Sequence, residues 1–200
     1  MSEIDDAVAA VRAGRLAIVP TDTVYGLATT PYSEAPVRRL YRAKGRDEIQ
    51  PTALVAADLD LLFECVPELR GRPGTIARAL LPGPYTLILP NPGRRFPWLT
   101  GSRPETIGVR VPAVGGPGAA VLAQVGAMVA TSANLPGGPD PRRLDDVPEE
   151  LRSAVDAVVD GGELPGTPST VLDLTGPEPA VVREGAVAAA EALRAVASVL

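Results

Sequence analysis

The sequence predicts an α/β fold in which helices flank a mixed β-sheet. Segments with apolar residues at helical spacing alternate with short apolar runs of strand length, and the alternation has no fixed period. Several strand candidates also follow one another through short links, which favours a mixed sheet over a purely parallel one. The chain has 200 residues, 46% of them apolar. We therefore expect residues 1–200 to form a single compact domain that buries about 70% of its unfolded-chain surface.

The first elements follow from local pattern. Ile4, Val8 and Val11 recur at helical spacing before Gly14, so the chain should open with a short helix. Residues 15–20, RLAIVP, then predict a buried strand. A second helix is expected over residues 33–46, because Ser33 can cap it and an apolar stripe follows.

Later elements are read in the same way. Two further helices, over residues 58–66 and 73–81, should end at the Pro-Gly-Pro sequence that starts at Pro82. Further strands are expected at residues 52–57, 85–90, 106–112, 127–133, 169–174 and 180–185. Further helices are expected at residues 121–126, at 144–155 and from Ala186 onward.

Composition limits the chemistry. The chain contains no histidine and one cysteine, Cys65, which excludes an intrachain disulfide and a multi-cysteine metal site. Catalysis must then depend on charges, hydroxyls, carboxylates or a recruited ion. The net charge of −5 argues against a surface dominated by nucleic-acid contacts. No apolar stretch is long enough to span a membrane and no secretory signal is evident, so we expect a cytoplasmic protein.

Polar groups gather where predicted strands end. The clearest example is PTDTVYGL, residues 20–27, in which two threonines and an aspartate follow an apolar run. Strand ends are where open α/β sheets commonly bind ligands. The same residues could equally form a capped turn that bonds its own backbone.

Other candidates also have two readings. Lys44 and Arg46 could be solvated charges at a helix C-terminus. Arg110 lies inside an apolar strand, so it either faces solvent or is paired in a cleft. Ser132, Asn134 and Ser169 could organise loops, and Arg183 could form a surface ion pair of little energetic value. The common nucleotide motifs are missing, because there is no G-x-x-x-x-G-K-[ST] and the GGPG at residues 115–118 lacks dinucleotide spacing.

Taken together, the segments resemble the YrdC-like family, the threonylcarbamoyl-AMP synthases. The matching segments, in chain order, are PTDTVYGL, KGR, LPGPYTLILP, GVRVP, ATSANLPGG, STVLDL and VREG. They extend from about Leu16 to Gly185, and the chain looks like the short, single-domain form of the family. The resemblance implies a twisted open sheet around a large, positively lined cavity.

The resemblance also implies a reaction. The family joins L-threonine, bicarbonate and ATP into threonylcarbamoyl-adenylate and releases pyrophosphate, with Mg²⁺ expected on the phosphates. A partner complex then transfers the threonylcarbamoyl group to tRNA adenosine, and weak binding of tRNA or double-stranded RNA is a further expectation.

Residue roles are carried over by position. Thr23, Arg110, Ala130 and Ser169 resemble the L-threonine contacts, with Arg110 suited to a carboxylate. The ATP contacts would be Arg46, Gln50, Thr106, Ser132, Asn134 and Arg183. Lys44 and Arg46 are expected to be catalytic through phosphate or carbamate contacts. No protein ligand for the metal is nominated; Asp22 is a candidate by proximity alone.

The pattern is not matched everywhere, and other functions compete. Gln50 stands where many relatives have Asn, Val55 where some have His, and Asp140 where a hydroxyl residue is common. One alternative is a non-catalytic YrdC-like protein that binds RNA. Another is a carbamoyl-transfer module like that of hydrogenase maturation, which normally sits in a longer, cysteine-rich chain and which a single cysteine disfavours.

Overall fold

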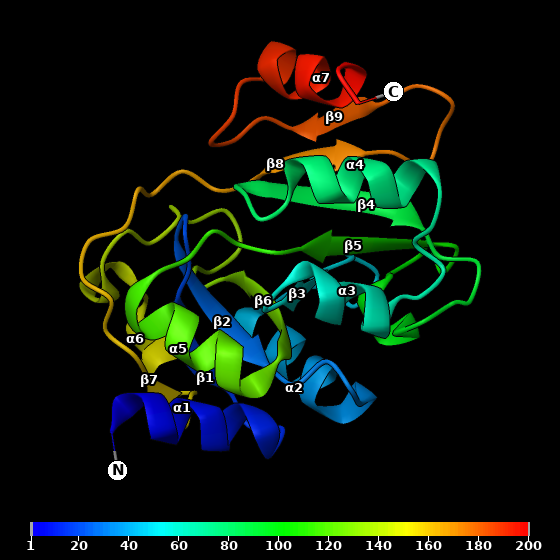
Figure 1. The fold of residues 1–200 in the computed structure, drawn as a ribbon. Coiled ribbons are helices and arrows are strands. Elements are labelled where there is room, and N and C mark those ends of the chain that lie inside the picture. The colour runs from blue at the N-terminus through cyan, green and yellow to red at the C-terminus, as the bar shows by residue number, and fades with distance from the viewer. Residues whose placement is uncertain (1, 200) are drawn as a thin grey trace.

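A computed structural model of the chain describes residues 2–199. One nine-stranded sheet runs through these residues, in the order β7-β1-β2-β6-β3-β5-β4-β8-β9 (Figure 1). The pairs β7·β1, β3·β5 and β4·β8 are parallel, and the other five pairs are antiparallel. The predicted mixed sheet with flanking helices is therefore confirmed.

The strands are short and the helices are of moderate length. The strands are β1 (Ala17–Pro20), β2 (Tyr25–Thr29), β3 (Ala53–Ala56), β4 (Tyr85–Pro90), β5 (Thr106–Arg110), β6 (Ala127–Ser132), β7 (Ala157–Val158), β8 (Thr170–Asp173) and β9 (Ala180–Arg183). The α-helices are α1 (Glu3–Arg12), α2 (Glu34–Lys44), α3 (Leu59–Cys65), α4 (Arg72–Leu80), α5 (Gly116–Val125), α6 (Glu149–Arg152) and α7 (Ala189–Ala197). Two 3₁₀ turns, Pro97–Leu99 and Leu144–Asp146, complete the set. In residues 2–199, no helix combines the length and apolarity needed to cross a membrane.

Different helices cover different ends of the sheet. Helices α1 and α5 contact each other and strand β1, while α4 and α7 pair at the other end, near β4 and β9 (Figure 1). The N- and C-termini consequently lie at opposite ends of the molecule in this view. Helix α1 begins as its sequence suggests, because Ser2 accepts a hydrogen bond from the backbone N–H of Asp5 in a capping box.

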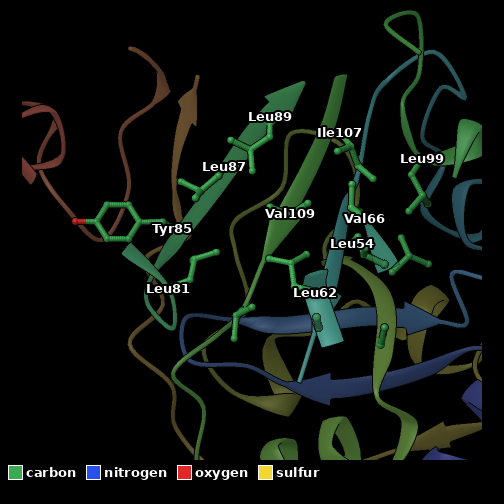
Figure 2. Close-up of a cluster of buried hydrophobic side chains, with 14 of the residues drawn as sticks. Leu54, Leu62, Val66, Leu81, Tyr85, Leu87, Leu89, Leu99, Ile107 and Val109 are labelled. Atoms are coloured by element: carbon green, nitrogen blue, oxygen red, sulfur yellow. The ribbon is translucent and has the colours of Figure 1, made fainter. Parts of the chain in front are cut away.

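The main core lies on one face of the central strands. Leu54 of β3, Val109 of β5, Leu87 of β4 and Leu172 of β8 are register partners and form one row across four strands. All four side chains are fully buried. Figure 2 shows three members of this row packed with leucines of β4 and α3. Each buried leucine contributes roughly 1.5–3 kcal/mol, so this row fixes the register of the sheet.

Several sequence expectations were wrong in detail. Strands β2 and β7 were not predicted, because β2 contains Gly26 and shows no polar alternation, and β7 has only two residues. The helix expected over residues 144–155 is a 3₁₀ turn followed by the one-turn helix α6, since Pro148 interrupts it. The C-terminal helix begins at Ala189 rather than Ala186.

Candidate functional site

A cavity of about 530 Å³ lies on the face of the sheet opposite the leucine row. Successive side chains of a strand point to opposite faces. In β5, Ile107 and Val109 enter the core, whereas Thr106, Gly108 and Arg110 line the cavity. Strands β3 and β4 show the same division. The alternation that builds the core therefore also builds the site.

Most residues predicted for the site meet at this cavity. The predicted residues that line it are Thr23, Arg46, Gln50, Thr106, Arg110, Ala130, Ser132, Ser169 and Arg183. They come from segments spread over the chain from β1 to β9, so only the fold brings them together. Lys44 and Asn134 are the two predicted residues that do not line the cavity.

The cavity is positively charged. Arg46, Arg103, Arg110 and Arg183 line it, and no carboxylate does among the residues that the structure describes. Burial lowers the pKa of the Arg46 and Arg110 guanidinium groups, and repulsion from Arg183 acts on both in the same direction. An anion bound among these groups would offset both the burial of the positive charges and their mutual repulsion. The site is thus suited to a polyanionic ligand.

Arg110 is held from the β1–β2 loop. Its Nη2 donates to the Asp22 carboxylate and, at 2.9 Å, to Thr23 Oγ1. The other oxygen of Asp22 accepts from the backbone N–H of Ala113 at 3.1 Å. The side chain of Arg110 is 12% exposed, so the reading in which it faces solvent is excluded. The carboxylate of Asp22 therefore joins Arg110 to the backbone at Ala113.

Thr21 keeps the role of a turn residue. Its hydroxyl donates to the carbonyl of Val24 at 2.7 Å and accepts from the backbone N–H groups of Thr23 and Val24. This local turn fixes the loop that carries Thr23, whose hydroxyl lies 3.2 Å from Thr21 Oγ1.

The KGR segment separates two basic side chains. Gly45 ends α2 in the left-handed region at φ 67°, where glycine costs least, and the N–H of Arg46 returns to the carbonyl of Tyr41. Beyond this turn, Arg46 reaches the cavity and donates to the carbonyl of Pro51 at 2.5 Å. Its buried Nε has no hydrogen-bond partner among the described residues.

Lys44 lies on the other side of the turn. Its ammonium donates to the carbonyl oxygens of Ser132 at 2.5 Å and Asn134 at 2.8 Å, and to Asn134 Oδ1 at 2.6 Å. Burial lowers the pKa of Lys44 to about 8, and repulsion from Arg46 adds to the shift. Asn134 in turn donates to the carbonyl of Gly138 at 2.7 Å. Both residues therefore support the loop behind Ser132.

The wall opposite the β1–β2 loop comes from β4, β8 and β9. Ser169 Oγ lies 2.8 Å from Thr86 Oγ1, and Arg183 Nη2 donates to the carbonyl of Ser169 at 2.8 Å. Gly185 allows this contact, because a Cβ at that position would stand 2.2 Å from the carbonyl oxygen of Pro168. The glycine of VREG is thus required for the close approach of the two segments.

Several polar residues of the site were not predicted. Thr86 and Arg103 are among those that line the cavity, and Asp22 accepts a hydrogen bond from Arg110. Alternation in β4 could have identified Thr86, because it is two residues before Ile88 on the same face. Arg103 lies in a turn and donates a hydrogen bond to Asp173 of β8 at 3.0 Å. No local sequence pattern predicts this contact.

Fold and site together define an α/β protein with a large arginine-lined cavity on one face of its mixed sheet. Comparison with known proteins then gives the family: residues 9–185 match the Sua5/YciO/YrdC domain, which is described as telomere recombination. The chain belongs to this family.

Individual relatives agree with this assignment. A threonylcarbamoyl-AMP synthase of Pyrococcus abyssi is 34% identical over 176 residues, which cover 88% of this chain and 52% of that protein. One of Stenotrophomonas maltophilia is 39% identical over 163 residues, covering 79% of this chain and 86% of that protein. The crystal structure of P. abyssi Sua5 complexed with L-threonine superposes with a TM-score of 0.87 at 31% identity, over all of this chain and 59% of that one. The chain thus spans about half the length of the Pyrococcus relative.

Proposed function

We propose that this chain is an L-threonylcarbamoyladenylate synthase, a nucleotidyltransferase that converts L-threonine, bicarbonate and ATP into threonylcarbamoyl-AMP and pyrophosphate. The observation that carries the proposal is the convergence of hydroxyl groups and four arginines on one cavity without a lining carboxylate in the described residues. Relatives that bear this enzyme name, and a similar structure that binds L-threonine, support it.

The amino acid would lie beside the β1–β2 loop. Arg110 offers a rigid charged donor for the carboxylate of L-threonine, and Thr23 stands next to it at 2.9 Å. Ala130, and Ser169 on the facing wall, would complete the contacts to the amino acid. A hydroxyl-rich wall suits a substrate that itself carries a hydroxyl and an amine.

ATP would occupy the remaining length. Arg46 and Arg183 would contact the phosphates, and Thr106, Ser132 and the rim residue Gln50 would contact the nucleotide. Asn134 would act on ATP through the loop that it organises with Lys44. Arg183 repels Arg46 as well as Arg110, and the phosphates of ATP would compensate the charges of Arg46 and Arg183.

The chemistry needs two bond-forming steps. The neutral amine of threonine attacks the carbon of bicarbonate, and loss of water leaves a carbamate. A carbamate oxygen then attacks the α-phosphorus of ATP, and the bond to pyrophosphate breaks. Positioning and cationic stabilisation carry most catalysis of this kind. Arg46 would stabilise charge on the reacting groups, and Lys44 would keep Ser132 in place behind it.

Magnesium is proposed as a partner of the nucleotide. In residues 2–199 there is no cluster of three or more side chains that could hold a metal ion, and both oxygens of Asp22 are engaged. The described residues therefore offer no carboxylate cage, and Mg²⁺ would enter on the phosphates of ATP, as it commonly does.

We further propose a cytoplasmic role in tRNA modification. The adenylate product would pass to a threonylcarbamoyl-transfer complex that modifies tRNA adenosine, with at most weak direct binding of tRNA or double-stranded RNA. The net charge of −5 and the four arginines that line a cavity favour catalysis over the alternative of a non-catalytic RNA-binding protein.

A pyrophosphate assay tests the function. Protein mixed with ATP, Mg²⁺, bicarbonate and L-threonine should release pyrophosphate, and omission of threonine should abolish the release. Arg183→Ala serves as the site variant and Arg12→Ala, which removes an exposed arginine from α1, as the matched control. Release that does not depend on threonine, or tight and steeply salt-dependent tRNA binding without release, would reject the proposal.

A further inference from the structure

We infer that Asp22 is a positioning residue that fixes the guanidinium of Arg110 for the carboxylate of the amino-acid substrate. The inference rests on the proposed function and concerns a residue that itself does not reach the substrate. Its basis is the geometry of the loop at residues 20–24 and the end of β5.

Asp22 and Thr23 are neighbours in sequence, and both accept hydrogen bonds from the same nitrogen atom of Arg110. Arg110 Nη2 donates both to the Asp22 carboxylate and to Thr23 Oγ1. The second oxygen of Asp22 accepts from the N–H of Ala113, three residues beyond Arg110. The carboxylate therefore ties the loop to the strand that carries Arg110 and to the chain that follows it.

Asp22 lies behind the substrate cavity. It borders a separate, smaller cavity of about 350 Å³, which also touches the start of α5, and it is absent from the lining of the large one. Its side chain is 8% exposed. Because it does not line the large cavity, it does not contact a ligand there, so its effect must pass through Arg110.

Charge explains why the pairing is needed. Burial disfavours the charged guanidinium of Arg110, Arg183 repels it, and Asp22 is the group that opposes both effects. Without the carboxylate, a largely buried cation would stay uncompensated, which is among the costliest losses in a protein interior. Arg110 would then turn away from Arg183, and Thr23 would lose the donor that it accepts from. We expect the loss of orientation to weaken binding more than the gain in local positive potential strengthens it.

The conservative variant Asp22→Asn provides the test, because asparagine keeps the shape and an acceptor for Ala113 but removes the charge. Calorimetric titration should show L-threonine bound at least about tenfold more weakly, with ATP affinity within about twofold of wild type. Asp156→Asn is the matched control, since Asp156 also pairs with an arginine, Arg15, and accepts a backbone N–H, but at an exposed site remote from the cavity. Unchanged or tighter threonine binding by folded Asp22→Asn would overturn the inference.

A double-mutant cycle separates positioning from general disturbance. If Asp22 acts through Arg110, Asp22→Asn should add less than about twofold to the loss already caused by Arg110→Lys. Equal effects of Asp22→Asn in both backgrounds would show that Asp22 acts independently of Arg110, against the inference.

A third measurement needs no substrate. In ¹⁵N spectra of arginine side chains, the Arg110 guanidinium should show hindered rotation in wild type and fast rotation in Asp22→Asn. Identical rotation in the two proteins would overturn the inference. If wild type binds no threonine at all, the proposed function fails, while these spectra still decide whether Asp22 orients Arg110.

Discussion

The Nζ atom of Lys44 and the Oδ1 atom of Asn134 lie 2.6 Å apart, although 90 residues separate them in the chain. This bond joins the end of α2 to the loop after β6, and Ser132, whose carbonyl also accepts from Lys44, faces the cavity at the end of β6. A buried cation thus supports one wall of the site without entering it.

Lys44→Met should loosen this wall. The substitution keeps the length of the side chain but leaves the carbonyls of Ser132 and Asn134 without their donor. We expect hydrogen exchange of the Gly138 amide, which closes the loop on Leu135, to accelerate by about tenfold or more. Arg42→Met, two residues earlier and exposed on α2, is the matched control and should leave this exchange unchanged. Equal exchange rates of the Gly138 amide in wild type and Lys44→Met would show that Lys44 does not support this loop.

Arg110→Ala and Arg183→Ala should affect different ligands. Loss of Arg110 should weaken L-threonine binding by roughly 2–5 kcal/mol, because a partly buried carboxylate would lose its charged partner. Loss of Arg183 should weaken ATP binding more than threonine binding. Calorimetry with each ligand on each variant measures both effects, and the reverse pattern would reject this division of the cavity.

Gly108→Val should fill the cavity without unfolding the sheet. A Cβ at Gly108 would meet Ala53 Cα at 3.6 Å, an ordinary contact, and it would project toward the substrates. We expect the melting temperature to stay close to that of wild type and ATP affinity to fall by about tenfold or more. Gly176→Val, in an exposed turn after β8, is the control. A variant that retains full ATP affinity would show that ligands do not reach the β5 floor.

Tyr25→Phe should lower the free energy of unfolding by about 1–2 kcal/mol, because the buried hydroxyl links β2 to the segment at residues 160–162. It accepts from the N–H of Gly161 at 2.9 Å and lies within donor distance of Asp160 Oδ1 and the carbonyl of Gly162. Urea denaturation at pH 7 measures the loss. Tyr32→Phe is the control, since that side chain is exposed and its hydroxyl meets only a weak acceptor, Cys65 Sγ, at 3.9 Å.

The same tyrosine predicts a pH effect. Burial raises the pKa of Tyr25 to about 12 from 10, so the folded state keeps this proton longer than the unfolded chain. Its contribution to stability is complete below pH 10 and is lost as the pH rises from 10 to 12. The stability difference between wild type and Tyr25→Phe should therefore shrink across that window. A difference that stays constant from pH 10 to 12 would contradict the shift.

Local pattern was enough to predict much of the fold. Apolar periodicity identified α1, α2 and most central strands, and the resemblance selected residues that the fold brings to one cavity. Strand β2 escaped because both of its faces are buried, so Tyr25 and Leu27 show no polar alternation. The pairing of Asp22 with Arg110 escaped because it depends on a contact between residues 88 positions apart. Patterns within a few residues cannot encode such a contact.

Strand β5 carries both the core and the site, and this restricts how the gene can change. A deletion or insertion of one residue inside β5 would reverse the facing of the residues on one side of it, so that Val109 would face the substrates or Arg110 the leucine row. Such a variant would lose ligand binding and the folded structure together. Length variation in this protein should therefore accumulate in connecting loops, while β5 varies by substitution alone.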